Sequence, residues 1–305
     1  MPKVRCQHCD GRSLQASSPS GTGDEATVLK PEVRRFYAEE IRAAAALPDG
    51  SATERLLEAF AAAPRENHVG PGPWLLRSPL YGLASRRTPN DDPEQLYHDV
   101  LVALDEVEDI NIGLPSLWAR FLHRASVSAG DSVLQVGAGS GYYTAILAAL
   151  VGSEGQVVAT EIDEKLAAMA EAALANRANV SIRRCNGATE LDTDAGPFDL
   201  IVAFAGVTHP TPSWIARLKP EGRMLLPVTD DSWWGAMLLF ERDGEAFDAT
   251  TLGACGFFPC AGARCDEAAG RISQLWSERS RLADLKLRVR LHNGGARYEV
   301  DGVEY

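Results

Sequence analysis

A glycine-rich loop between a strand and a helix constrains the fold of this chain more than any other feature. The apolar run 132–136 predicts a buried strand, Gly137-Ala-Gly-Ser-Gly141 follows it, and residues 142–151 are apolar enough for a buried helix. Glycines let a backbone approach a ligand closely, and a helix that begins there points free N–H groups at that ligand. The sequence predicts a ligand-binding turn, with a tight turn that binds nothing as the alternative.

Strands and helices alternate around and after this loop. The predicted elements that follow it are strands and helices at 156–161, 165–176, 180–184, 199–204, 213–218 and 223–228. Such alternation is typical of βαβ units, which build a parallel sheet with helices on its faces. We therefore predict an α/β fold with a Rossmann-like, mostly parallel and doubly wound sheet.

The flanking segments predict additions to this core. Helical spacing of apolar residues predicts N-terminal helices over 33–47, 52–63 and 114–125, with an irregular crossing over 65–95. The C-terminal part is predicted to be α+β, with a hairpin turning at Asp243-Gly244, a helix near 267–280 and strands around Asn293-Gly294. We predict a disordered tail over 1–29 and an N-terminal helical and substrate-side segment over 30–125. A ligand-binding core over 126–230 and a C-terminal extension over 231–305 follow.

Composition limits the partners of the protein. The 305 residues include 42 acidic and 30 basic side chains, a net charge of −12, and this balance weighs against a nucleic-acid partner. The longest apolar run is shorter than the roughly 20 residues that span a bilayer, and the polar N-terminus has no signal-peptide core. We expect a cytoplasmic protein that does not bind a membrane; the sequence does not indicate its oligomeric state.

Two cysteines near the N-terminus have the spacing of half a zinc site. Cys6 and Cys9 are separated by two residues, but a structural zinc needs four ligands and no second such pair follows. Incidental thiols in a tail are therefore favoured over a labile metal or redox site. We predict no metal.

The ligand of the glycine loop is predicted to contain a nucleoside. Tyr142 occupies the third glycine position of the dinucleotide fingerprint, so that pattern fails. Glu161 ends the second strand, 22 residues after Gly139, where a carboxylate can accept both ribose hydroxyls. Asn186 and Gly187 follow the third strand, where an amide can meet the adenine edge.

Several motifs together resemble a known family. The loop resembles the first motif of class I S-adenosylmethionine-dependent methyltransferases, and residues 133–148 resemble that of the protein-L-isoaspartate O-methyltransferase family. Asn186-Gly187 is similar to the Asp-Gly pair of that family, and residues 197–202 and 218–227 are similar to its later strands. Upstream, residues 61–69 are similar to the family's helix that ends in Pro-Arg. The resemblance covers roughly 50–230. It implies S-adenosylmethionine as cofactor, contacted by Asn111, Ile112, Gly137, Gly139, Gly141, Glu161, Asn186 and Gly187.

The chain departs from that family on the substrate side. The family reads Thr-Ile-Ser-Gln-Pro where this chain has Asn111-Ile-Gly-Leu-Pro115, so Gly113 replaces a serine with a catalytic role; Gln135 replaces the acidic residue of the first motif. Members with extended tails methylate an aspartate of an encoded peptide, which then cyclises to an imide. We expect an O-methyltransferase that esterifies an aspartyl or isoaspartyl carboxylate of a peptide or protein. A small-molecule methyltransferase and a cofactor-binding protein without turnover remain alternatives.

Such a reaction needs positioned hydrogen-bond donors more than a base. A carboxyl acceptor, with a pKa of about 4, is already ionised at neutral pH. Asn111, Ser116 and His209 are the predicted catalytic residues that position the acceptor, with Thr208 beside them; a surface histidine is the alternative for His209.

The C-terminal extension offers candidates for binding the acceptor. Trp233 and Trp234 predict either a lid or peptide platform or, as the favoured interpretation, a packed hydrophobic corner. The extension is predicted to dock at the carboxyl edge of the sheet, where Arg288, Arg290 and Arg297 would meet an acidic peptide.

Overall fold

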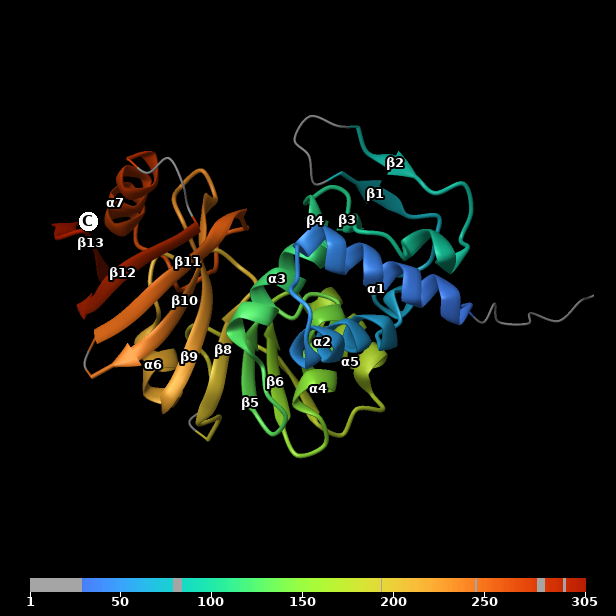
Figure 1. Cartoon of the computed structure of the whole chain (residues 1–305), viewed down its shortest axis with the longest axis horizontal. Coiled ribbons are helices and arrows are strands. Elements are labelled where there is room, and N and C mark those ends of the chain that lie inside the picture. The colour runs from blue at the N-terminus through green and yellow to red at the C-terminus, as the bar shows by residue number, and fades with distance from the viewer. Residues whose placement is uncertain (1–28, 79–83, 193, 245, 279–282, 293–294) are drawn as a thin grey trace, which may run out of the picture.

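The protein has two lobes joined by one sheet, as seen in this computed structural model (Figure 1). Short strands and helices of the N-terminal part lie on one side of the central strands, and C-terminal antiparallel strands lie on the other. The structure describes residues 29–78, 84–192, 194–244, 246–278, 283–292 and 295–305.

The N-terminal part forms a helical layer and a small sheet. Pro31 and Pro115 each occupy the first turn of a helix, where the missing N–H has no partner to lose. The small sheet has the order β2-β1-β3-β4. The elements are α1 (Pro31–Ala45), α2 (Ser51–Ala62), η1 (Arg65–His68), β1 (Leu75–Arg77), β2 (Arg86–Arg87), η2 (Pro93–Leu96), β3 (Leu101–Asp105), β4 (Ile110–Asn111) and α3 (Pro115–Ala125).

The core is a five-stranded parallel sheet. Its elements are β5 (Ser132–Val136), α4 (Tyr142–Val151), β6 (Gln156–Glu161), α5 (Glu164–Leu174), β7 (Val180–Arg184), β8 (Phe198–Ala203), α6 (Pro212–Arg217) and β9 (Leu218–Thr229). The strand order is β9-β8-β5-β6-β7. The chain adds β6 and β7 on one side of β5 and then β8 and β9 on the other, so the order of addition reverses between β5 and β8. Ligands of open α/β sheets bind at the carboxyl ends of the strands beside such a reversal.

The C-terminal part continues this sheet with antiparallel strands. The elements are β10 (Trp234–Asp243), β11 (Ala246–Gly256), α7 (Asp266–Ser277), β12 (Ala283–His292), β13 (Gly295–Val300) and β14 (Val303–Glu304). They extend β9 outward in the order β10 to β14 and complete a ten-stranded sheet. The predicted division at residue 230 falls between two adjacent strands of this sheet, and the domain boundaries stay predictions.

Two hydrophobic cores cover the two faces of the sheet. Along β5, Val133 packs into the core that contains the N-terminal helices, whereas Leu134 and Val136 pack into the core that contains α7. Alternate residues of a strand point to opposite faces, so a strand covered on both sides is mostly apolar; the buried Gln135 of β5 is polar and accepts the Thr144 hydroxyl hydrogen. This is why the core strands appear as continuous apolar runs in the sequence.

The predicted helices and strands of the core and the C-terminal part are confirmed, with shifts of a few residues at their ends and a longer β9. Within 65–95, predicted to be irregular, the structure has η1, β1, β2 and η2, and the pair β3–β4 was not predicted. These strands have two to five residues, too few to show a period. The tail with Cys6 and Cys9, and the turn at Asn293-Gly294, lie outside the described residues.

Two further observations concern the described residues alone. No helix among them combines the length and apolar character that crossing a bilayer requires. No cluster of three or more His, Cys, Asp or Glu side chains in the described ranges could hold a metal ion.

Candidate active site

The glycine loop joins β5 to α4 at the carboxyl edge of the sheet. Gly137, Gly139 and Gly141 all have positive φ, between 55° and 86°, which other residues adopt only with strain. A Cβ at Gly141 would lie 2.9 Å from Leu174 of α5, whereas a Cβ at Gly139 would meet nothing within 4 Å. Gly141 therefore permits close helix packing, and the backbone at Gly139 borders open space that a ligand can fill.

Glu161 is attached to this loop. One carboxylate oxygen accepts the Gly139 N–H at 2.7 Å and the other accepts the Asp163 N–H at 3.0 Å. The side chain is 7% exposed. Burial raises the pKa of the Glu161 carboxyl, although the N–H groups of Asp163 and Gly139 favour the ionised form and oppose this shift. Each oxygen keeps a further lone pair, so the carboxylate can still accept ligand hydroxyls.

The raised pKa predicts a pH-dependent affinity for a ribose-containing ligand. Only the ionised carboxylate accepts two hydroxyl hydrogens, and Glu161 becomes protonated at a higher pH than an exposed glutamate. We expect the affinity for S-adenosylhomocysteine to fall on acidification before the pH reaches the ordinary value of 4.5. Calorimetric titrations across pH measure this effect. Glu161→Gln should abolish the pH dependence; an unchanged affinity in the parent down to pH 4.5 would contradict the assignment.

Asn186 and Gly187 lie beside the same loop. A Cβ on Gly187 would lie only 2.1 Å from Oγ1 of Thr160, whose carbonyl accepts the N–H groups of Gly137 and Ala138. Asn186 Oδ1 accepts the Ala188 N–H and so closes the turn. The carboxyl ends of β5, β6 and β7 are thus drawn together, as the sequence predicts for the cofactor-binding residues. Their roles in binding stay predictions.

Ile162 is a candidate that the sequence analysis missed. It follows Glu161 directly and is 63% exposed, whereas most large apolar side chains of the described chain are buried. An apolar side chain beside the acid predicted to bind the ribose is suited to the face of a base. The signal in the sequence was the isoleucine after the strand-end glutamate.

The segment of Asn111 and Ile112 approaches the start of α4. Asn111 Oδ1 accepts the Gly113 N–H at 2.9 Å, and Ile112 is buried. Gly113 has φ of 85°, and a Cβ there would lie 3.1 Å from Trp118 and 3.2 Å from Tyr143. Two aromatic rings therefore take up the space that a serine side chain at 113 would need.

The other predicted acceptor-side residues fall into separate groups. Ser116 is buried in the first turn of α3, and its N–H donates to Asp99 Oδ1. Thr208 and His209 lie in the loop after β8, joined by a hydrogen bond of 2.9 Å. No hydrogen bond in the described part of the chain joins Asn111 or Ser116 to this pair. The structure does not bring the predicted acceptor-positioning residues into direct contact.

The His209 imidazole is buried beside the Thr208 hydroxyl. That hydroxyl accepts the Cys265 N–H, and its oxygen lies 2.9 Å from Nδ1 of His209. Because a hydroxyl oxygen can accept two hydrogens and also donate one, either atom can be the donor of this bond. Burial lowers the pKa of the imidazole and so favours its uncharged form, and Nε2 takes no part in the bond to Thr208.

The C-terminal extension supports the loop that carries His209. Gly206 N–H donates to Phe258 O, Thr208 N–H donates to Ala263 O, and the Tyr298 hydroxyl donates to Thr208 O at 2.7 Å. The segment with Phe258 and Ala263 therefore lies at the carboxyl edge. The prediction assigned this place to the hairpin over 237–252 and to the strand pair around Asn293-Gly294, and it was wrong for both, because β10–β11 and β12–β13 continue the sheet.

The three arginines proposed to meet an acidic peptide are already paired. Arg288 binds Asp243 and Asp248, Arg290 binds Glu299, and Arg297 binds Glu304, all within the extension. Cross-strand and turn carboxylates pair with these side chains, a pairing that depends on strand register, and a contact with an acidic peptide stays a prediction. A role for them in acceptor binding has no support from this geometry.

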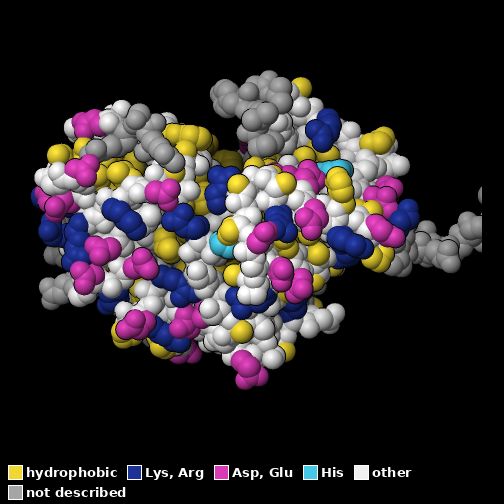
Figure 2. Space-filling view, viewed as in Figure 1, with side chains coloured by type: hydrophobic (Ala, Val, Ile, Leu, Met, Phe, Trp, Pro, Cys, Tyr) yellow, Lys and Arg dark blue, Asp and Glu magenta, His cyan; other side chains and the backbone are white. Residues whose placement is uncertain are grey.

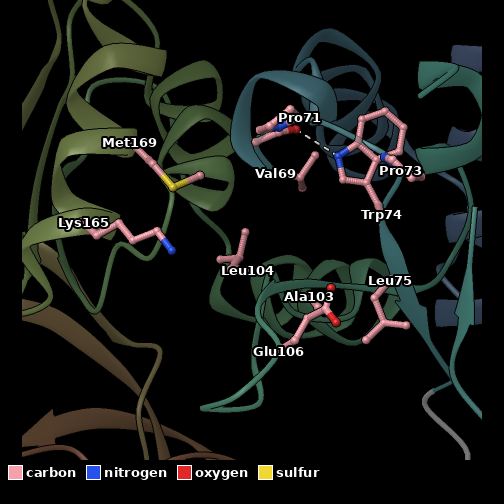
Figure 3. A pocket seen from close by; sticks show the side chains of 11 residues that line it. Val69, Pro71, Pro73, Trp74, Leu75, Ala103, Leu104, Glu106, Lys165 and Met169 are labelled. Carbon is pink, nitrogen blue, oxygen red and sulfur yellow. Dashed lines mark hydrogen bonds between the residues drawn. The ribbon is translucent and has the colours of Figure 1, made fainter. Parts of the chain in front are cut away.

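A cavity of about 260 Å³ lies between the N-terminal part and α5 (Figure 3). It is bounded by the segment Val69–Leu75, by β3 and by α5, and Glu106 and Lys165 reach it from opposite sides. None of the predicted cofactor-binding residues lines it. Its volume is below the roughly 300–1,000 Å³ of typical small-molecule sites.

The residues present fit a nucleoside-bearing cofactor. The open backbone at Gly139, the buried carboxylate of Glu161 and the exposed Ile162 are contiguous at the reversal point of the sheet. A neutral imidazole lies on the neighbouring loop. This arrangement can bind a ribose and orient a second reactant at the carboxyl edge of the strands.

Comparisons with known proteins agree with this geometry. Residues 88–264 match the family described as protein-L-isoaspartate(D-aspartate) O-methyltransferase. The protein-L-isoaspartate O-methyltransferase of Koribacter versatilis is 29% identical over 252 residues, 81% of this chain and 96% of its own length. That of Methanocella arvoryzae is 31% identical over 177 residues, 57% of this chain and 91% of its own length.

Solved structures show the same fold. A protein-L-isoaspartate O-methyltransferase superposes with a TM-score of 0.61 at 22% identity, over 75% of this chain and 66% of that one. A putative protein-L-isoaspartate O-methyltransferase from Plasmodium falciparum, in complex with S-adenosyl-L-homocysteine, superposes with a TM-score of 0.55 at 16% identity. The match covers 75% of this chain and 98% of that one. The predicted Rossmann-like methyltransferase fold is confirmed.

Proposed function

Because the chain belongs to the protein-L-isoaspartate(D-aspartate) O-methyltransferase family, we propose that it esterifies an aspartyl or isoaspartyl carboxylate of a peptide or protein. It is an S-adenosylmethionine-dependent carboxyl methyltransferase, the reaction class of that family. The observation that carries the proposal is the hydrogen bond between Gly139 and Glu161 at adjacent strand ends, because it supports a ribose site within the family's matched region.

The residues of the site have defined tasks in this proposal. S-adenosylmethionine, when bound, supplies an electrophilic methyl group. Glu161 accepts the ribose hydroxyls, the glycine loop leaves room for the rest of the cofactor, and Asn186, Gly187 and Ile162 border the base. His209 donates from Nε2 to the acceptor carboxylate. A general base is unnecessary because the acceptor carboxyl is already ionised at neutral pH, and orientation of the reactants lowers the barrier by as much as roughly 7–11 kcal/mol.

Gly113 supports an acceptor more specialised than an arbitrary isoaspartyl peptide. The resemblance implies a serine hydroxyl at this position, and here Trp118 and Tyr143 occupy the space around a glycine of positive φ. The position therefore lacks that hydroxyl, and the two rings beside it are buried in the core.

Purified protein incubated with S-adenosylmethionine and matched aspartyl and isoaspartyl peptides tests the proposal. We expect a gain of one methyl group that mild base removes, because an ester is labile. Turnover of a short generic isoaspartyl peptide should be slow, since Gly113 supplies no hydroxyl. Turnover as fast as that of an ordinary repair enzyme of the family would contradict the specialised site. A base-stable methyl group, or none, would contradict ester formation.

The same measurement separates the remaining alternatives. A net loss of water in the acceptor would identify imide formation in a modified peptide, the finer function that the extended C-terminal part suggests. Consumption of S-adenosylmethionine without label on either peptide would favour a small-molecule acceptor. Tight cofactor binding without label on any carboxylate would favour a binding protein.

A further inference from the structure

Three large aromatic side chains are exposed together at the carboxyl edge of the sheet. Trp233 and Trp234 lie in the β9–β10 turn with 48% and 53% exposure, and Phe258, after β11, has 39%. The rings of Trp233 and Phe258 are 5.3 Å apart. Figure 2 shows hydrophobic side chains gathered on the upper rim of the C-terminal lobe. The packed corner favoured from the sequence is therefore wrong, since these rings face solvent.

The turn that carries the two tryptophans is held rigidly. Asp230 Oδ1 accepts both the N–H and the hydroxyl hydrogen of Ser232, and the Asp230 N–H donates to Trp234 O at 2.9 Å. The Phe257 N–H donates to Trp233 O, which ties the turn to the end of β11. Trp233 itself has φ of 65°, an outlier for a bulky residue. Strain of this kind persists where the surrounding structure enforces it, and it often marks functional sites.

A chain of aromatic contacts joins this turn to the glycine loop. Phe257, next to Phe258, lies 5.6 Å from the ring of Trp118, and Trp118 stacks on Phe204 at 3.6 Å. Phe204 in turn lies 3.5 Å from where a Cβ of Gly137 would be. Trp118 is buried, so these ring contacts pass through the interior of the protein. The backbone gives a direct link, because the Gly206 N–H donates to Phe258 O and Gly206 is two residues from Phe204. The segment that carries the exposed rings therefore adjoins the start of the loop after β8, beside the cofactor site, and an extended peptide of a few residues, at about 3.3 Å per residue, would connect the two places.

We propose that Trp233, Trp234 and Phe258 form an aromatic platform that binds an aromatic or aliphatic side chain of the acceptor polypeptide, a few residues from the methylated carboxylate. This inference rests on the proposed function, because it takes the acceptor to be a polypeptide. Rigid aromatic rings lose little conformational entropy on binding and provide a large apolar contact area. The continuity with the cofactor site makes the acceptor the occupant, rather than a second copy of the chain.

Two isoaspartyl peptides that differ at one position test the platform. One carries tryptophan and the other serine, scanned two to six residues from the acceptor residue. Binding to the protein saturated with S-adenosylhomocysteine is measured by calorimetry, and methylation is measured separately. We expect the tryptophan peptide to bind about tenfold more tightly than the serine peptide at one or two positions.

The variants Trp234→Ala and Trp233→Asn should remove this preference, with the affinity for S-adenosylhomocysteine unchanged. Asparagine at 233 tolerates the positive φ and so keeps the turn. Phe36→Ala is the matched control, since Phe36 is a 64% exposed aromatic on α1. It should keep the preference for the tryptophan peptide.

The outcomes separate this inference from the proposed function. A binding preference without methylation would support the platform and contradict the function. The platform would be overturned if both peptides were methylated and bound with equal affinity. It would also be overturned if Trp234→Ala and Trp233→Asn both kept the preference for the tryptophan peptide. If sedimentation showed that the tryptophan variants only dissociate a dimer while peptide affinity stays the same, the patch would be a self-association surface and the platform would again be overturned.

Discussion

S-adenosylhomocysteine is expected to bind Glu161→Ala more weakly than the parent by about 1–3 kcal/mol, or roughly 5- to 150-fold. The parent carboxylate offers charge-assisted hydrogen bonds to the ribose from a buried position, where water competes poorly. The substitution also releases the Gly139 N–H that this carboxylate accepts, so the loop loses an attachment. Isothermal calorimetry at neutral pH measures the difference.

Glu164→Ala is the control for this experiment. Glu164 is an exposed acid in the first turn of α5, three residues away, and its removal changes the net charge equally. The affinity of Glu164→Ala for S-adenosylhomocysteine should equal that of the parent within experimental error. Equal affinities of the Glu161 variant and the parent, measured on proteins that unfold at the same temperature, would remove Glu161 from the site.

Gly187→Ala is expected to destabilise the protein by about 1–3 kcal/mol. The new Cβ would lie 2.1 Å from Thr160 Oγ1 and 3.2 Å from Val136, both in buried strands of the core. Threonine is stiff at χ1 and the strand backbone is held by the sheet, so little can move aside. Chemical denaturation of parent and variant gives the change in the free energy of unfolding.

Two further variants make this prediction specific. Thr160→Ala removes the Oγ1 atom that the new Cβ would meet. The double variant should therefore lose less stability than the sum of the losses of the two single variants, a difference that a double-mutant cycle quantifies. Gly270→Ala, in the exposed interior of α7 with nothing within 4 Å, should stabilise the protein by as much as about 1 kcal/mol. A Gly187→Ala protein as stable as the parent would show that the contact relaxes without cost.

The order of elements in the core was readable from the sequence because the information is local. β5 and α4 begin and end where the apolar run and the glycine loop predict. Gly137, Gly139 and Gly141 identified the loop. Glu161 could be predicted to lie beside it, because parallel strands bring their carboxyl ends to one edge of the sheet whatever the details of packing. The ligand class followed from those residues, and the family from a wider set of motifs.

Contacts between distant segments were decided by the tertiary structure. Sequence spacing cannot show that Trp118 and Tyr143 fill the space around Gly113, or that the Cys265 N–H donates to the Thr208 hydroxyl beside His209. It also gave the wrong environment for Trp233, because exposure at a turn depends on which neighbours cover it. Strand register, which paired Arg288 with Asp243 and Asp248, is likewise a long-range outcome.

The sequence by itself determined the local pattern: an apolar strand, a loop that only glycines can form, and an acid at the next strand end. The tertiary structure alone decided which side chains from remote segments line the acceptor side. The physical reason is that backbone conformation and apolar periodicity are set within a few residues, whereas burial, ion pairing and aromatic contacts depend on packing between elements up to hundreds of residues apart.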